Sequence, residues 1–204
     1  DVVLGRIVFA VVDAQNAAHR GDNTQAPENT MPAFKAAVEN GADWIELDVT
    51  QTKDGVLVIF HDSDLMRMTG KPDKIWDMSY EELSQINTAS HWGPFFKDTR
   101  IPTLEEVLDY CKDKIKLNIE VKVNDHQTQD FIARLVGLIH QMNRYFMKRE
   151  YANVGADELD GLLRKANEEH AEIVRLFELR DGEELQRFIR DVHWSIDNAK
   201  FLVW

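Results

Sequence analysis

Apolar and polar positions change their period several times along the first half of the chain. Between Thr30 and Asn40 the apolar side chains recur at helical spacing, with Pro32 in the first turn and Gly41 after the end. These features predict a helix. From 43 to 50 apolar residues alternate with acidic ones, which predicts a strand with one apolar face.

Further elements follow in the same half. A turn at 53–55 leads into the apolar run 56–60, which predicts a second, buried strand. The tetrapeptides at 79–82 and 103–106 both have the form Ser/Thr-x-x-Glu, and we expect a helix to begin at each of them. The stretch 116–123 alternates again and predicts a strand with a polar face.

The second half of the chain has a different pattern. Helical spacing recurs over 131–139, 159–177 and 185–192, and only 201–204 is typical of a short strand. The apolar stretch 2–12 predicts either a first strand or a packed N-terminal segment. Strands that alternate with helices favour an α/β fold with parallel strands. We therefore expect a TIM-type (β/α) barrel, incomplete or irregular in its second half, because a complete barrel typically takes ~250 residues.

Length and composition limit the classes of function. A chain of 204 residues is expected to form one domain. Its net charge of −12 argues against nucleic acid as a partner, because a negative protein repels a phosphate backbone. Cys111 is the only cysteine, so no disulfide can form within the chain.

The sequence also limits how the chain meets a membrane. The apolar stretch 2–12 contains Arg6 and is far shorter than the ~20 residues that cross a bilayer. The chain begins without a methionine, which leaves room for an anchor upstream. We expect a domain that folds in water, either cytoplasmic or the extracytoplasmic part of a membrane-anchored protein. The sequence predicts no oligomeric state.

Two pairs of polar residues on the predicted strands suggest metal chemistry. Glu46 and Asp48 are two positions apart, so both side chains leave the same face, and neighbouring carboxylates repel unless a cation or a proton joins them. Glu120 and Lys122 repeat this arrangement on a later strand. Three carboxylates would offer Ca²⁺ or Mg²⁺ an all-oxygen set of ligands, and Lys122 could meet a substrate phosphate. The alternatives are a solvent-facing acidic strand and an ordinary ion pair.

Two histidines are placed where a barrel would hold catalytic groups. His19 precedes Arg20 and the loop 22–29, and His61 directly follows the run 56–60, so both are expected at the carboxyl ends of strands. One histidine can accept a proton from the nucleophile while another donates one to the leaving oxygen, and Arg20 can bind phosphate oxygens. We interpret the other histidines as surface or capping residues: His91, His126, His140, His170 and His193.

Short motifs follow one another in a recognisable order. They are His-Arg-Gly at 19–21, Pro-Glu-Asn-Thr at 27–30, Gly-Ala-Asp at 41–43, Glu-Leu-Asp-Val at 46–49, Thr-Lys-Asp-Gly at 52–55 and His-Asp at 61–62. Ile-Pro-Thr-Leu-Glu-Glu at 101–106 and Asn-Ile-Glu-Val-Lys at 118–122 extend the series. In order and spacing this set resembles the glycerophosphodiester phosphodiesterase family, over about residues 18–140.

The resemblance implies a fold, a site and a substrate class. It implies a TIM-type barrel, here a single domain 1–204 with a small insertion at about 63–100. It assigns metal binding to Glu46, Asp48 and Glu120, acid and base catalysis to His19 and His61, and phosphate binding to Arg20 and Lys122. The family's usual substrates are glycerophosphodiesters such as glycerophosphocholine, which are cleaved to glycerol phosphate and an alcohol.

The predicted reaction is metal-dependent hydrolysis of a phosphodiester. The metal, Ca²⁺ or Mg²⁺, would lower the pKa of an attacking hydroxyl, and the two histidines would exchange protons with the nucleophile and the leaving alcohol. One alternative is a phospholipase-type phosphodiesterase that acts on lipid substrates. The other is a truncated or engineered barrel that binds metal without turnover. In the insertion, we expect Trp92, Phe95 and Phe96 to pack and close it over the barrel rather than to line a substrate mouth.

Overall fold

The computed structural model describes the first part of the chain almost continuously. It covers residues 7–9, 16–122, 124–135 and 137–138, and then 161, 164–165, 168–169, 171–172, 174–176, 179, 184 and 187. Contacts divide the chain into two compact units, one of residues 5–128 and the other of residues 1–4 with 129–204. All of the predicted site residues belong to the unit 5–128.

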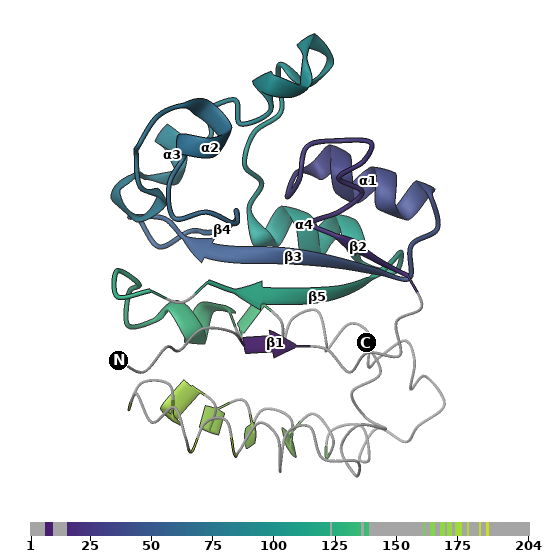
Figure 1. Ribbon diagram of the computed structural model, residues 1–204. Helices are drawn as coiled ribbons and strands as arrows, with labels where there is room; N and C mark the ends of the chain where they lie inside the picture. Colours follow the sequence, from purple (N-terminus) through teal and green to yellow (C-terminus); the bar gives the residue numbers. More distant parts are fainter. Residues whose placement is uncertain are drawn as a thin grey trace. The chain divides into compact units, whose positions relative to one another are not determined.

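The core of the unit 5–128 is a five-stranded sheet (Figure 1). Its strands are β1 (Ile7–Phe9), β2 (Ala17–His19), β3 (Trp44–Gln51), β4 (Leu57–Ile59) and β5 (Lys116–Val121). Their order is β1-β5-β3-β2, and β4 also pairs with β3. β3 runs parallel to both β2 and β5, whereas β1 is antiparallel to β5 and β4 is antiparallel to β3. The strands predicted at 43–50, 56–60 and 116–123 are therefore present, and the predicted parallel pairing holds at the centre of the sheet.

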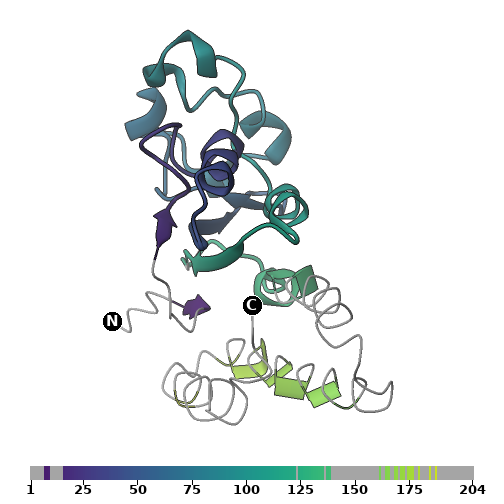
Figure 2. The same cartoon turned by 90° about the vertical axis from the view of Figure 1, so that its right-hand side faces the viewer.

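Side-chain caps fix where the helices begin. α1 (Met31–Glu39) starts after Thr30, whose side chain accepts a hydrogen bond from the backbone of Ala33. α3 (Tyr80–Leu83) and α4 (Leu104–Cys111) both start with a complete capping box, at Ser79 and Thr103. Each box satisfies free backbone amides at the helix start, so the two predicted starts are confirmed. α1 and α4 contact each other and lie beside the sheet (Figures 1 and 2).

A segment without strands separates β4 from α4, and we refer to its residues 63–100 as the insertion, the name given to them in the sequence prediction. Its helices are α2 (Met66–Thr69), η1 (Ile75–Asp77), α3, η2 (Ser90–Trp92) and η3 (Pro94–Phe96). It has an apolar core of its own, shared with the end of β4 and formed by Val58, Phe60, Leu65, Met68, Ile75, Leu83 and Ile101. The insertion is therefore folded locally against the hairpin that precedes it.

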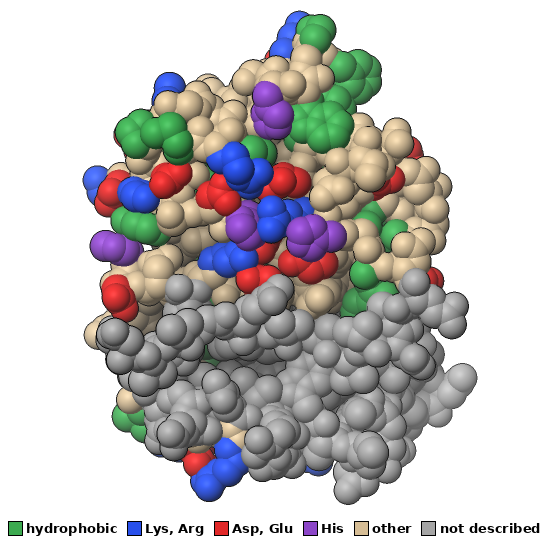
Figure 3. All heavy atoms as spheres, viewed as in Figure 1, with side chains coloured by type: hydrophobic (Ala, Val, Ile, Leu, Met, Phe, Trp, Pro, Cys, Tyr) green, Lys and Arg blue, Asp and Glu red, His purple; other side chains and the backbone are tan. Residues whose placement is uncertain are grey.

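The aromatic residues of the insertion do not pack as predicted. Phe95 is 90% exposed and Trp92 is 37% exposed. Both rings meet Phe96 edge to face, at centroid distances of 5.2 and 5.9 Å. Trp92 and Phe95 therefore pack against Phe96 instead of entering the core. Figure 3 shows apolar side chains gathered in this part of the surface.

The described residues of the other unit are mainly helical. Residues 131–135 and 137–138 form helix, and so do most of the described positions between 161 and 187. Phe131, Ile132 and Leu135 are buried, in agreement with the predicted helical period. The strand predicted at 201–204 and His140, His170 and His193 lie outside the described residues. Within the described part of the chain, no helix is long and apolar enough to span a membrane.

Candidate active site

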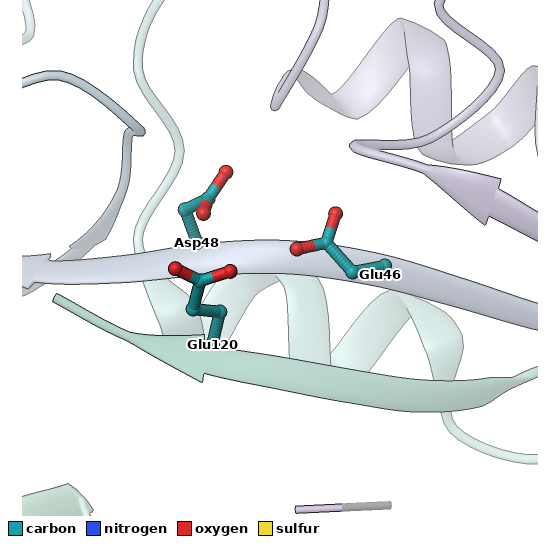
Figure 4. A group of neighbouring side chains, drawn as sticks. All are labelled: Glu46, Asp48 and Glu120. Atoms are coloured by element: carbon teal, nitrogen blue, oxygen red, sulfur yellow. The ribbon is translucent and has the colours of Figure 1, made fainter. Parts of the chain in front are cut away.

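The register between β3 and β5 brings three carboxylates together. Glu46 pairs with Asn118 and Asp48 pairs with Glu120, across two parallel strands. Since residues two apart on a strand share a face, these side chains all leave one side of the sheet. One carboxylate oxygen from each of Glu46, Asp48 and Glu120 lies within 4.8 Å of the other two (Figure 4). The alternation in the sequence predicted this convergence.

The cluster combines three largely buried carboxylates with the ammonium group of Lys122. Asp48 is fully buried, and burial together with the negative charge of Asp48 raises the pKa of the Glu46 carboxyl. Lys122 Nζ lies 2.5 Å from Glu120 Oε1 and 2.9 Å from Asp48 Oδ1. Burial alone would lower the pKa of Lys122, but these two carboxylates raise it on balance. One ammonium therefore partly neutralises the three carboxylates.

Unsatisfied polar atoms gather at the same place. Among the described residues, three buried side-chain atoms make no hydrogen bond of good geometry. Asn118 Oδ1 has no donor, whereas Arg20 Nε and Asp48 Oδ1 are held only by the ion pairs of Arg20 with Asp48 and of Asp48 with Lys122. Buried polar groups are normally paired, and three carboxylates beside an amide oxygen without a donor, with only Lys122 and Arg20 as neighbouring positive charges, leave room for a further cation. Hard divalent cations take oxygen ligands of this kind. The residues present therefore fit Mg²⁺ or Ca²⁺.

His19 reaches the cluster from the end of β2. β2 pairs with β3 so that His19 lies opposite Glu46, and His19 Nε2 is 3.7 Å from Glu46 Oε2. The backbone N–H of Arg20 donates a 3.0 Å hydrogen bond to the same oxygen. Arg20 (φ +58°) and Gly21 (φ +82°) then form a sharp left-handed turn. The side chain of His19 is 62% exposed, which leaves its ring accessible to a substrate.

The Arg20 side chain is held between two carboxylates. Its Nη1 donates to Glu28 Oε1 at 2.9 Å, and its Nε is 3.4 Å from Asp48 Oδ2. Asn29 Nδ2 donates to the same Asp48 oxygen at 2.7 Å. Sequence reasoning gave no role to Glu28 or Asn29. The available signal was their position, directly between the His-Arg-Gly loop and the Thr30 cap of α1.

His61 lies after a strand of the opposite direction. His61 follows the carboxyl end of β4, as predicted, but β4 is antiparallel to β3. The turn at 53–55 folds the chain back, and the backbone N–H of Phe60 donates to Asp48 O at 2.9 Å. This hairpin returns the chain to the level of the carboxylates. His61 Nδ1 is 2.6 Å from Asp62 Oδ1.

Arg67 of α2 connects the His61 segment with the Arg20 segment. Its Nε donates to Asp62 Oδ2 at 2.7 Å, and its Nη2 and Nη1 donate to the two oxygens of Glu28 at 2.6 and 3.2 Å. Burial would raise the pKa of Asp62 and of Glu28, but the Arg67 guanidinium holds both below their usual values. Sequence reasoning did not single out Arg67, because nothing local distinguishes it from a surface arginine.

The predicted site residues thus form one connected group. His19, Arg20, Glu46, Asp48, Glu120 and Lys122 are linked by direct contacts. Among the described residues, His61 joins them through Asp62, Arg67 and Glu28. Figure 3 shows acidic, basic and histidine side chains gathered on one face. Of the other described histidines, His91 is exposed and His126 stacks on Trp76 at a centroid distance of 4.5 Å.

Solved structures resemble this chain over about three fifths of its length. A phosphodiesterase of Oleispira antarctica, in complex with the product sn-glycerol-3-phosphate, is 35% identical with a TM-score of 0.58, and the match covers 62% of this chain and 51% of that one. A glycerophosphodiester phosphodiesterase of Agrobacterium tumefaciens is 32% identical with a TM-score of 0.56, over 62% and 52% of the two chains.

Curated relatives match over a similar share. A glycerophosphodiester phosphodiesterase of Caldanaerobacter subterraneus is 47% identical over 106 residues, which are 52% of this chain and 44% of that protein. Human glycerophosphodiester phosphodiesterase 1 is 33% identical over 121 residues, or 58% of this chain and 37% of that protein. The chain spans about half the length, or less, of these relatives.

The family itself is established by a match that covers most of the chain. The sequence model of the Glycerophosphoryl diester phosphodiesterase family matches residues 19–189. The family adopts a TIM-type barrel, and the parallel strands β2, β3 and β5 with their helices agree with that fold class, as predicted. The chain therefore belongs to the glycerophosphoryl diester phosphodiesterase family.

Proposed function

We propose that this chain hydrolyses glycerophosphodiesters to glycerol phosphate and an alcohol, with a divalent cation at the carboxylate cluster. The observation that carries the proposal is the meeting of three carboxylates within 4.8 Å, beside the buried Asn118 Oδ1, which has no donor. Arg20 and Lys122 lie at the same cluster and supply positive charge for a phosphate. We also propose a single barrel domain over 1–204, with the insertion at about 63–100.

Three residues would hold the cation. Glu46, Asp48 and Glu120 provide the oxygen ligands, and this donor set suits Mg²⁺ or Ca²⁺. When bound, such a cation supplies Lewis acidity, which neutralises phosphate oxygens and lowers the pKa of an attacking hydroxyl. Arg20 and Lys122 bind the remaining phosphate oxygens, Arg20 through its planar fork and Lys122 as a point charge.

The two histidines move the protons of the reaction. A hydroxyl, from water or from the glycerol moiety, forms a new bond to phosphorus while the bond from phosphorus to the leaving alcohol oxygen breaks. One of His19 and His61 takes the proton of the hydroxyl, and the other protonates the departing alkoxide. The side chain of His19 is 62% exposed and that of the half-buried His61 is 33% exposed, which leaves both rings open to a substrate.

The substrate class rests on this chemistry and on the relatives. The product sn-glycerol-3-phosphate is bound in the Oleispira antarctica phosphodiesterase, and we infer a similar glycerophosphate moiety for this chain, as in glycerophosphocholine. A specific observation supports a second candidate, the hydrolysis of lipid phosphodiesters. Phe95 and Trp92 are exposed on the insertion, as is Met66 at 50%, and exposed aromatic and apolar side chains suit a lipid interface.

The test is hydrolysis of glycerophosphocholine with and without a chelator. We expect release of choline that EDTA abolishes and that Mg²⁺ or Ca²⁺ restores. Asp48→Asn should abolish both turnover and the rise in melting temperature that the cation gives. Asp109→Asn, which changes an exposed carboxylate on α4, is the matched control and should preserve both.

Each alternative function has its own result in this assay. A rise in melting temperature with cation but no choline release would favour a barrel that binds metal without turnover. Faster cleavage of a micellar lysophospholipid than of glycerophosphocholine would favour the lipid phosphodiesterase. Turnover that is unchanged by EDTA would contradict the metal-dependent mechanism.

A further inference from the structure

Arg67 stands out in the insertion because it binds two carboxylates at once. It donates three hydrogen bonds of 2.6 to 3.2 Å, one to Asp62 and two to Glu28. Glu28 comes from the loop before α1, and Asp62 follows β4. Neither carboxylate belongs to the candidate cation cluster. Arg67 therefore connects Glu28 and Asp62, which are 34 residues apart in sequence. Neither of these ion pairs involves a proposed ligand of the cation.

Each of these carboxylates in turn holds a residue of the candidate site. Asp62 Oδ1 lies 2.6 Å from His61 Nδ1, and Glu28 Oε1 accepts a 2.9 Å hydrogen bond from Arg20 Nη1. One guanidinium on the insertion thus stands between the proton-transfer residue His61 and the phosphate-binding residue Arg20.

The two branches have distinct chemical consequences. A carboxylate at Nδ1 accepts the proton of that nitrogen, which fixes the ring orientation and leaves Nε2 for proton transfer with a substrate. A carboxylate on one arm of Arg20 limits the rotation of its fork. Arg67 can hold both carboxylates because its guanidinium presents several donors in one plane.

We propose that Arg67 is a positioning residue, which aligns His61 through Asp62 and Arg20 through Glu28 for phosphodiester hydrolysis. This inference rests on the proposed function. It gives the insertion a role in the chemistry, because α2 supplies the residue that links the two sides of the site. Arg67 touches neither the carboxylate cluster nor, in this proposal, the substrate.

The test compares variants of two ion pairs in the same insertion. Arg67→Met removes the guanidinium, and Arg67→Lys keeps the charge but not the planar fork. Lys74→Met is the matched control, since it removes the 2.8 Å pair between Lys74 and Asp64, which does not touch His61. Exposed pairs of this kind stabilise a fold little, so all three variants should melt near the wild-type temperature.

We expect Arg67→Met to lower kcat/KM for glycerophosphocholine by about 10–100-fold, as loss of a partner that orients a site residue commonly does. Arg67→Lys should lose most of this activity too, because a lysine cannot hold both carboxylates in one plane. Lys74→Met should stay within about twofold of wild type. If Arg67→Met melts too low for a rate measurement, Arg67→Lys carries the comparison.

A second measurement needs no activity. Nitrogen-15 spectra of histidine-labelled protein distinguish whether Nδ1 or Nε2 of His61 carries the proton. In wild type and Lys74→Met we expect the Nδ1–H form, and in Arg67→Met a mixture of both forms. Absence of turnover by the wild type would end the proposed function and leave this spectral test standing. Equal spectra and equal rates for Arg67→Met and Lys74→Met would overturn the proposal for Arg67.

Discussion

The two histidine segments reach the same site by different structural routes. His19 ends β2, which pairs in parallel with β3 and places the ring opposite Glu46. His61 follows β4, which is antiparallel to β3, and it depends on Asp62 and on an arginine of the insertion. Backbone pairing brings both segments to the cluster, but the His61 side chain is held in addition by Asp62, which Arg67 holds in turn.

The carboxylates beside the two histidines also differ in their electrostatics. Burial and the charge of Asp48 raise the pKa of Glu46, the carboxylate near His19. Burial acts the same way on Asp62, but hydrogen bonds from Arg67 and His61 lower its pKa on balance. The His19 side therefore holds negative charge that lacks a full counter-charge, while the His61 side is already neutralised. In the proposed function, a divalent cation therefore binds on the first side only.

The largest expected effect comes from removing either histidine. His19→Ala and His61→Ala should each lower kcat for glycerophosphocholine by about 10²–10⁴-fold, because the reaction needs both a proton acceptor and a proton donor. The measurement is choline release at saturating substrate. The cation should still raise the melting temperature of both variants, since the carboxylates remain.

This pair of variants can break the comparison between the two sides. Near-normal turnover by His61→Ala would mean that His61 only caps β4 and takes no part in proton transfer. Near-normal turnover by His19→Ala would mean instead that His19, at the end of the parallel strand β2, takes no part in proton transfer.

A smaller effect tests the backbone turn that follows His19. Gly21 has φ +82°, and a Cβ added there would lie 2.7 Å from Ala33 Cβ and 2.8 Å from the Ala33 carbonyl carbon. Gly21→Ala should lower the free energy of unfolding by about 2–4 kcal/mol, from left-handed strain plus overlap with α1. Thermal unfolding measures it, at roughly 2–4 °C per kcal/mol.

The matched control lies on the His61 side of the molecule. Gly70 has φ +75°, and nothing lies within 4 Å of an added Cβ. Gly70→Ala should therefore show the strain alone, about 1 kcal/mol. If both variants lost the same free energy of unfolding, the close approach of Gly21 to Ala33 would contribute nothing to stability.

The sequence could predict the His19 side because its signals are local. Alternation along 43–50 and 116–123 gives the face of each side chain, and parallel pairing then brings Glu46, Asp48 and Glu120 together. The two capping boxes were equally readable, because hydroxyl and carboxylate lie three residues apart and act on their own helix.

The His61 side could not be predicted in the same way. The direction of β4 depends on how the turn at 53–55 folds back, and the apolar run alone has no direction. The contact of Arg67 with Glu28 joins residues 39 positions apart, which no local period encodes. Burial was misjudged at Phe95, because apolar character alone does not require a side chain to be buried.

The smallest expected effect concerns the opposite pKa shifts of Glu46 and Asp62, measured as stability against pH in EDTA. Because the pKa of Glu46 is raised in the folded state, its contribution to the free energy of unfolding is fully present below the unfolded-state pKa. This contribution is lost as pH rises through the folded-state pKa. The lowered pKa of Asp62 gives the reverse, a contribution present above the unfolded-state pKa and lost as pH falls through the folded value.

Two variants should separate these opposite signs. At neutral pH without a cation, Glu46→Gln should melt above wild type, because it removes a carboxylate that the fold disfavours, and Asp62→Asn should melt below it. The Arg20 N–H offsets part of the burial cost at Glu46, and solvent partly screens Asp62, so each difference should be about 1 kcal/mol. Both differences should vanish in acid, where wild type is protonated at these positions. Added Mg²⁺ or Ca²⁺ should reverse the order for Glu46→Gln alone, since that variant loses a proposed ligand. If Glu46→Gln melted below wild type in EDTA, the unbalanced negative charge would not lie on the His19 side. The proposed electrostatic difference between the His19 side and the His61 side would then be wrong.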